Sequence, residues 1–165
     1  LILAHVDAAE NTLRLTRLDG ADVARDGTRA WAPRAMEQGV DIGFARQAGE
    51  TGLMGDAQLL KEMLGNLIDN ALRYAATRIG VSAGGSLQGV CWRVTDNGPG
   101  IPAAQRSAVF APFHRLANGI EGAGLGLTIV QRIAHLHGAT VELSDSAAGS
   151  GLEVTIRFPA LPEAA

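Results

Sequence analysis

The sequence predicts an α/β fold in which a mixed, mostly antiparallel sheet is covered by helices on one face. Two long segments repeat apolar residues at the three- and four-residue spacing of a helix. Four shorter apolar runs are joined in pairs by turn-forming residues, which is typical of hairpins. Strands and helices do not alternate regularly along the chain, which argues against a doubly wound sheet. The expected architecture is therefore a two-layer sandwich of helices on strands.

The clearest helix is expected from about residue 56 to residue 74, with Asp56 as its N-cap. A second strong helix is expected over about 124–137, ending at Gly138. In the first of these helices, apolar residues at helical spacing make one wide face, which consists of Leu59, Leu60, Met63, Leu64, Leu67, Ile68, Ala71 and Leu72.

A further helix is expected over residues 21–38. Trp31 and Met36 would be its packing residues, and Pro33 would disturb it locally. Gly84-Gly85-Ser86 is expected to turn one hairpin. The strands are predicted at residues 40–46, 53–54, 78–83, 87–96, 139–144 and 152–158.

The composition indicates one globular domain. A chain of 165 residues fits a single domain, and its 47% hydrophobic and 19% charged residues are typical of globular proteins. The net charge of −3 gives no sign of the basic surface that nucleic-acid binding requires. No apolar run approaches the roughly 20 residues of a membrane span.

Polar residues line one side of the helix predicted at 56–74. Glu62, Asn66 and Asn70 recur every four residues, and Arg73 lies one turn beyond Asn70. A solvated helix face is one interpretation. However, asparagine is a poor helix former, and its amide oxygen is a suitable ligand for Mg²⁺. A metal–phosphate site is therefore the second interpretation.

The motif Asp96-Asn97-Gly98-Pro99-Gly100-Ile101 directly follows an apolar strand. Its Asn-Gly and Pro-Gly pairs are strong turn signals, so a plain loop is one interpretation. The other is a ligand site. In that case Asp96 would accept a hydrogen bond from an amine, and the glycines would let a planar ligand lie against bare backbone.

The motif Gly122-Ala123-Gly124-Leu125-Gly126-Leu127 opens the last predicted helix. Glycines here leave the N-terminal amides accessible, where the helix dipole favours anions such as phosphate. A flexible hinge is the alternative. Just before it, Phe110-Ala111-Pro112-Phe113-His114-Arg115 would anchor a loop, so that residues 114–121 close over a ligand.

The order and spacing of these clusters resemble the catalytic domains of bacterial sensor histidine kinases. The pattern from Glu62 to Tyr74 resembles the N box of that family, and residues 96–101 resemble the G1 box. Phe110-x-Pro112-Phe113 is similar to the F box, and residues 122–127 to the G2 box. The resemblance covers roughly residues 40–159.

The resemblance implies a Bergerat-type sandwich that holds Mg–ATP between the N-box helix and a lid. Glu62, Asn66 and Arg73 would serve catalysis, and Asn70 would hold Mg²⁺. Asp96 would bind the adenine amine and so select ATP over GTP. The implied ATP-binding residues are Asn66, Asn70, Arg73, Tyr74, Asp96, Gly98, Gly100, Ile101, Phe113, Arg115, Gly122, Gly124, Leu125, Gly126 and Leu127.

Asn66 also bears on the type of reaction. In the related gyrase and Hsp90 ATPases, a glutamate at this place activates water, whereas an amide cannot act as a general base. The resemblance therefore implies a protein-histidine kinase that transfers phosphate to a side chain rather than to water. An anti-sigma-type serine kinase and a non-catalytic nucleotide-sensing scaffold are the alternatives.

Residues 1–10 are expected to be the tail of a dimerisation helix, and residues 11–165 the catalytic domain. His5 does not match the family's phosphoacceptor pattern, so the acceptor histidine is expected upstream. The implied partners are that dimerisation domain and the receiver domain of a response regulator, with no nucleic acid. The whole protein is expected to be a homodimer tethered to the bacterial inner membrane, with this domain in the cytoplasm.

Overall fold

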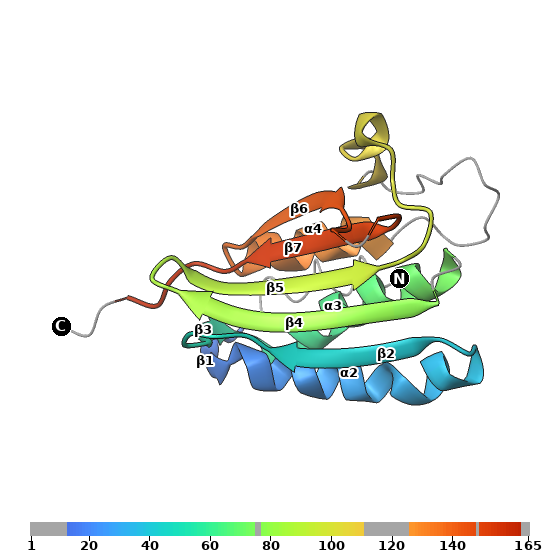
Figure 1. Ribbon diagram of the computed structural model, residues 1–165. Helices are drawn as coiled ribbons and strands as arrows, with labels where there is room; N and C mark the ends of the chain where they lie inside the picture. The colour runs from blue at the N-terminus through green and yellow to red at the C-terminus, as the bar shows by residue number, and fades with distance from the viewer. Residues whose placement is uncertain (1–12, 75–76, 111–125, 148, 163–165) are drawn as a thin grey trace.

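The structure is a computed structural model, and it describes residues 13–74, 77–110, 126–147 and 149–162. A five-stranded sheet has the strand order β2-β4-β5-β7-β6, and the helices lie behind it in a second layer (Figure 1). β2 and β4 run parallel, and the other neighbouring strands run antiparallel. The predicted α/β sandwich with a mixed, mostly antiparallel sheet is therefore confirmed. The strands are β2 Asp41–Arg46, β4 Arg78–Ser86, β5 Gly89–Asp96, β6 Thr140–Asp145 and β7 Leu152–Arg157.

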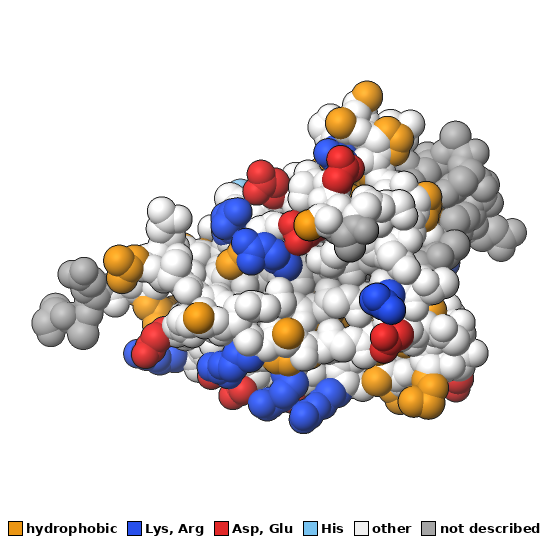
Figure 2. All heavy atoms as spheres, in the orientation of Figure 1, with side chains coloured by type: hydrophobic (Ala, Val, Ile, Leu, Met, Phe, Trp, Pro, Cys, Tyr) orange, Lys and Arg blue, Asp and Glu red, His pale blue; other side chains and the backbone are white. Residues whose placement is uncertain are grey.

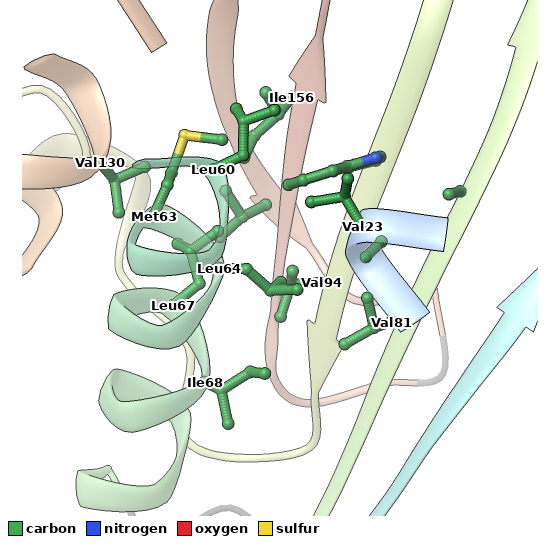
Figure 3. Close-up of a cluster of buried hydrophobic side chains, with 14 of the residues drawn as sticks. Val23, Leu60, Met63, Leu64, Leu67, Ile68, Val81, Val94, Val130 and Ile156 are labelled. Atoms are coloured by element: carbon green, nitrogen blue, oxygen red, sulfur yellow. The ribbon is translucent and has the colours of Figure 1, made fainter. Parts of the chain in front are cut away.

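Helix α3 (Ala57–Arg73) supplies most of the helical side of the core. The Asp56 carboxylate caps it by accepting hydrogen bonds from the backbone N–H groups of Gln58 and Leu59, at 3.1 and 3.2 Å. All eight apolar residues predicted for its inner face are buried. Figure 3 shows several of them pointing from the helix toward Val81 and Val94 of the sheet. The helical period in the sequence thus identified the buried face correctly.

Helix α2 (Gly20–Glu37) begins after Asp19, which caps it through hydrogen bonds from two backbone N–H groups. Trp31 is partly buried against the core, as predicted. Met36 is 78% exposed, so its predicted packing role is wrong. Its neighbour Ala35 takes the buried position in the last turn, which turns Met36 toward solvent. The helix continues through Pro33 to its end.

The turn between β4 and β5 differs from the prediction. Gly84 and Gly85 lie inside β4, and the chain turns at Leu87 and Gln88 instead. Glycines are needed inside β4 because the loop between β2 and β3 crosses it closely. The Gly85 N–H donates to the Ala48 carbonyl of that loop at 3.0 Å. A Cβ on Gly85 would collide with the backbone carbonyl of Glu50. These glycines therefore make room for a crossing loop.

A small second sheet pairs β1 (Thr16–Asp19) with β3 (Gly52–Gly55) in antiparallel register. The sequence predicted β3 but not β1. Trp92 at the centre of β5 connects the large sheet to the start of α2, because its indole N–H donates to the Gly20 carbonyl at 3.1 Å. The Trp92 ring also packs edge-to-face on Phe158, with the ring centroids 5.1 Å apart.

Among the described residues, no helix packs on the other face of the large sheet (Figure 1). Across this face Ser82, Arg93, Thr155 and Glu142 are in register on four neighbouring strands. Figure 2 shows acidic and basic side chains interspersed on this side of the molecule. Within the described ranges, no helix combines the length and the apolar character that a membrane crossing requires.

Candidate functional site

Helices α3 and α4 (Gly126–Leu136) contact each other at both of their ends, and the candidate site lies at one of these ends. At one end, Gly126 opens helix α4 so close to Asn70 that an added Cβ would lie 2.9 Å from Asn70 Oδ1. At the other end, the Asp56 N–H donates to His137 Nε2 at 3.0 Å. The two helices therefore run antiparallel. This brings Gly126, which belongs to the predicted anion motif, to the Asn70 end of α3.

His137 holds this arrangement as a neutral imidazole. Its Nδ1 lies 2.8 Å from the Ile133 carbonyl, to which it donates when Nε2 accepts from Asp56. Burial lowers the pKa of His137, although the Ile133 carbonyl and the nearby Asp56 carboxylate act in the opposite direction. The sequence analysis did not identify this residue as part of the site's framework.

The polar edge of α3 is partly buried and internally bonded. Asn66 Nδ2 donates to the Glu62 carbonyl at 2.8 Å, one turn back along the helix. Arg73 Nε contacts Asp69 Oδ2 at 2.8 Å, and the Arg73 side chain is exposed. The structure brings Asn70 to α4, whereas Arg73 pairs with its own helix. The predicted role of Arg73 at a phosphate stays a prediction.

Asp96 ends β5, and the chain then leads through a loop to the two short helices η1 (Ala103–Gln105) and η2 (Ala108–Phe110), which lie at the top of Figure 1. Its Oδ1 accepts hydrogen bonds from the backbone N–H groups of Gly98 and Leu152, at 2.9 and 3.3 Å. Burial raises the pKa of the Asp96 carboxyl, and these two bonds oppose that rise. Among the described residues, both bonds go to Oδ1 and neither goes to Oδ2.

Asn97 ties the loop after β5 to the start of β4. Its Oδ1 accepts from the backbone N–H groups of Thr77 and Arg78, at 2.8 and 2.9 Å. Its Nδ2 donates to Thr77 Oγ1 at 2.8 Å. This side chain therefore fixes the Asp96 loop (residues 97–101) relative to the start of β4. Sequence reasoning missed this role, because it took Asn97 only as a turn signal.

Two glycines let the hairpin between β6 and β7 press against the same loop. Gly100 has a φ of +74°, and a Cβ there would lie 3.0 Å from the Gly151 carbonyl oxygen. Gly151 has a φ of +125°, and a Cβ there would collide with the Asp96 carbonyl. In this structure Gly100 serves close packing of the backbone, which the ligand-centred prediction did not anticipate.

The remaining predicted residues fall into two groups. Ile101 is buried at the end of the Asp96 loop, Leu127 lies near the start of α4, and Tyr74 is the C-cap of α3. The others lie outside the described residues, namely Phe113, Arg115, Gly122, Gly124 and Leu125. Flanking that segment, Thr128 Oγ1 of α4 donates to the Phe110 carbonyl at 2.6 Å.

Comparison with known proteins identifies the kind of molecule that this arrangement belongs to. The family model for histidine kinase-, DNA gyrase B- and HSP90-like ATPases matches residues 55–162. The sensor protein kinase PmrB of Pseudomonas aeruginosa is 34% identical over 166 residues, covering 91% of this chain and 34% of PmrB. The signal transduction histidine-protein kinase AfsQ2 of Streptomyces coelicolor is 34% identical over 168 residues, covering 94% of this chain and 31% of AfsQ2.

Solved structures of sensor histidine kinases are also similar to this chain. The mycobacterial sensor histidine kinase MprB matches with a TM-score of 0.75 and 28% identity, covering 90% of this chain and 99% of that chain. Full-length ShkA in complex with AMPPNP matches with a TM-score of 0.79 and 28% identity, covering 98% of this chain and 34% of that chain.

The chain therefore belongs to the family of histidine kinase-, DNA gyrase B- and HSP90-like ATPases. Within it, the chain is an ATP-binding catalytic module of the two-component sensor histidine kinases. This confirms the family resemblance of the four sequence boxes. The chain spans about a third of the length of PmrB and AfsQ2.

Proposed function

We propose that the chain binds Mg–ATP between α3, the Asp96 loop and the first turn of α4, and transfers the γ-phosphate to a histidine. The observation that carries this proposal is the contact between Gly126 and Asn70. It sets an amide oxygen beside a helix N-terminus, where backbone N–H groups and the helix dipole favour phosphate. Asp96 Oδ2 would accept the adenine amine, which guanine lacks at that place.

The donor set around Asn70 suits Mg²⁺ that arrives with the nucleotide. Mg²⁺ takes oxygen ligands and is usually held by one or two protein groups together with phosphates and waters. In the part of the chain that the structure describes, no three His, Cys, Asp or Glu side chains are grouped to hold a metal alone. Asn70 Oδ1 would be the protein ligand, and the ion would neutralise phosphate charge.

Asn66 supports transfer to a protein side chain rather than hydrolysis. Its Nδ2 is engaged with the Glu62 carbonyl, and its amide cannot take a proton from water. Phosphoryl transfer needs mainly positioning and charge stabilisation. Glu62 and Asn66 would position the phosphates or metal-bound water. Arg73 would leave Asp69 to meet a phosphate, and Tyr74 would pack near the adenine.

The whole protein would then be a membrane-tethered sensor kinase. Residues 1–10 would end a dimerisation helix, and residues 11–165 would form the catalytic domain. PmrB is a sensor protein kinase by name, and AfsQ2 a signal transduction histidine-protein kinase, which supports the same role here. The acceptor histidine would lie in an upstream dimerisation domain of a homodimer. From there the phosphate would pass to the receiver domain of a response regulator, with this domain in the cytoplasm.

Thermal unfolding tests the nucleotide site directly. Mg–ATP at about 100 times its Kd should add ~2.7 kcal/mol to the free energy of unfolding, which raises the midpoint by roughly 5–10 °C. We expect this shift with Mg–ATP, a much smaller one with Mg–GTP, and its loss in Asp96→Ala. No shift at millimolar Mg–ATP would overturn the proposal and favour a scaffold without nucleotide binding.

A second experiment tests the acceptor. The chain extended by its upstream dimerisation segment should take up label from γ-labelled ATP into an acid-labile phosphohistidine. An acid-stable product would instead favour a serine kinase. An extended protein that binds ATP but labels no residue would contradict the kinase reaction while leaving the nucleotide site intact.

A further inference from the structure

We propose that Arg106 is a positioning residue for adenine recognition, which it supports by joining the Asp96 loop to the β6–β7 hairpin. Arg106 follows η1, outside the four sequence boxes. Its Nε donates to the Ile101 carbonyl at 3.1 Å, and its guanidinium contacts Asp145 Oδ1 at 2.5 Å. The inference rests on the proposed nucleotide site, because Asp96 is the group that would read the adenine.

The Arg106 guanidinium connects the Asp96 loop to the end of β6, whose relative positions must be kept. Ile101 is the last residue of the Asp96 loop, and its side chain is buried. Asp145 is the last residue of β6. Only 22% of the Arg106 side chain is exposed, so its stem is packed although its partner Asp145 is 81% exposed. A planar guanidinium can satisfy two acceptors at once with a fixed geometry, which a single ammonium group cannot do.

The hairpin end that Arg106 holds is also the one that holds Asp96. Asp145 faces Leu152 across the β6–β7 pair. The Leu152 N–H donates to Asp96 Oδ1, and Gly151 packs against the Asp96 carbonyl. Arg106 therefore closes a ring that runs from Asp96 through the loop, the guanidinium and the hairpin back to the same carboxylate. Loss of Arg106 would let the hairpin and the loop move apart, and Asp96 Oδ2 would lose its fixed direction.

This role differs from a general contribution to stability. An ion pair to a carboxylate as exposed as Asp145 adds little to the free energy of unfolding. Recognition of the adenine amine, by contrast, depends on an acceptor held within a fraction of an ångström of its productive place. The effect of removing Arg106 should consequently appear in base discrimination.

The test compares binding of Mg–ATP and Mg–ITP by calorimetry, because hypoxanthine carries a carbonyl where adenine carries its amine. In Arg106→Met, which keeps the aliphatic stem, we expect the preference for ATP over ITP to fall about fivefold to tenfold, from weaker ATP binding alone. Asp145→Asn should move the ratio in the same direction by less. Affinity for ITP should stay within about twofold in both variants, because the phosphate contacts are unchanged.

Arg157→Met is the matched control. Arg157 pairs with Glu142 across the same two strands at 3.8 Å, at the opposite end of the hairpin. The control should keep the full ATP preference. The inference is overturned if Arg106→Met and Asp145→Asn retain the wild-type ratio, or if ATP and ITP weaken equally. A wild-type protein that does not prefer ATP would instead contradict the proposed function itself.

Discussion

Asp96 is the residue at which folding and ligand recognition oppose each other. Burial raises the pKa of its carboxyl above the ordinary value, so the folded chain binds this proton more tightly than the unfolded chain does. The stability that this group contributes is complete below its ordinary pKa of about 3.9 and is lost as pH rises through the higher folded value. At neutral pH the ionised Asp96 therefore lowers the free energy of unfolding, while it provides the acceptor for adenine.

We expect Asp96→Asn to stabilise the protein and weaken ATP binding together. The amide oxygen can still accept from the Gly98 and Leu152 N–H groups, and the desolvated charge is gone. The amide N–H₂ would face the adenine amine, donor against donor, so ATP affinity should fall roughly tenfold to a hundredfold. Chemical denaturation gives the rise in unfolding free energy, and calorimetry gives the loss of affinity.

Mg–ITP makes this prediction sharper, because its carbonyl can accept from the new amide. ITP should bind Asp96→Asn at least as well as it binds the wild type. Asp41→Asn, at the exposed start of β2, serves as the control and should change neither quantity. A variant that loses stability, or that still prefers ATP as the wild type does, would refute this account of Asp96.

The residues proposed to touch the nucleotide lie in local sequence motifs, whereas the residues that hold them in place do not. Asn70 and Asp96 belong to local motifs whose spacing carries the signal. Arg106 meets its partner Asp145 across 39 positions, and Leu152 meets Asp96 across 56. Neither pairing leaves a local pattern, since each depends on how the β6–β7 hairpin folds back on the loop.

At the scale of elements, the antiparallel packing of α3 and α4 depends on His137 being neutral. Protonation of Nε2 would point an N–H at the Asp56 N–H and lose that hydrogen bond. The pKa of His137 is lowered by burial, so the unfolded chain binds more protons near that pKa. The free energy of unfolding should therefore fall as pH drops from about 6.5 through the lower folded value.

The measurement is urea denaturation at about pH 7 and about pH 5.5, on either side of the histidine titration. His137→Phe should lose ~1–3 kcal/mol at the higher pH, because the Asp56 N–H loses its acceptor. It should also show a smaller fall in stability between the two values than the wild type. His135→Phe, on the exposed side of the same helix, should keep the wild-type fall. An equal fall in both variants would show that His137 is not the titrating group.

Helices and strands were predictable where a periodic apolar pattern continues over many residues. They were less predictable where contact with a distant segment determines the local structure. Helix α3 repeats its apolar face over several turns, and its cap and its core side were both correct. Strand β1 is short and begins with exposed residues, so it has no pattern of its own and forms only against β3. Gly84 and Gly85 were taken for a turn because sequence does not show the loop that crosses them.

At the scale of the whole molecule, one hydrophobic core joins helices α2, α3 and α4 to the sheet. The residues that would bind nucleotide lie on its margin, at the end of β5 and the start of α4. Because the two layers share a single core among the described residues, we expect them to unfold as one unit. Leu64 lies at the centre of this core, fully buried beneath α2, where its side chain meets Gly27.

Leu64→Ala should lower the free energy of unfolding by ~2–5 kcal/mol, because it removes buried methyl groups and leaves a cavity. For a domain of this size each kcal/mol shifts the midpoint by roughly 2–4 °C. Leu87→Ala is the control, since Leu87 is 101% exposed at the β4–β5 turn and should change stability by less than ~0.5 kcal/mol. Tryptophan fluorescence, which includes the buried Trp92, and far-ultraviolet circular dichroism should report one shared midpoint in both variants. Separate midpoints for the two signals would mean that the helical layer and the sheet are not stabilised by a common core, and a small loss in Leu64→Ala would place the centre of that core elsewhere.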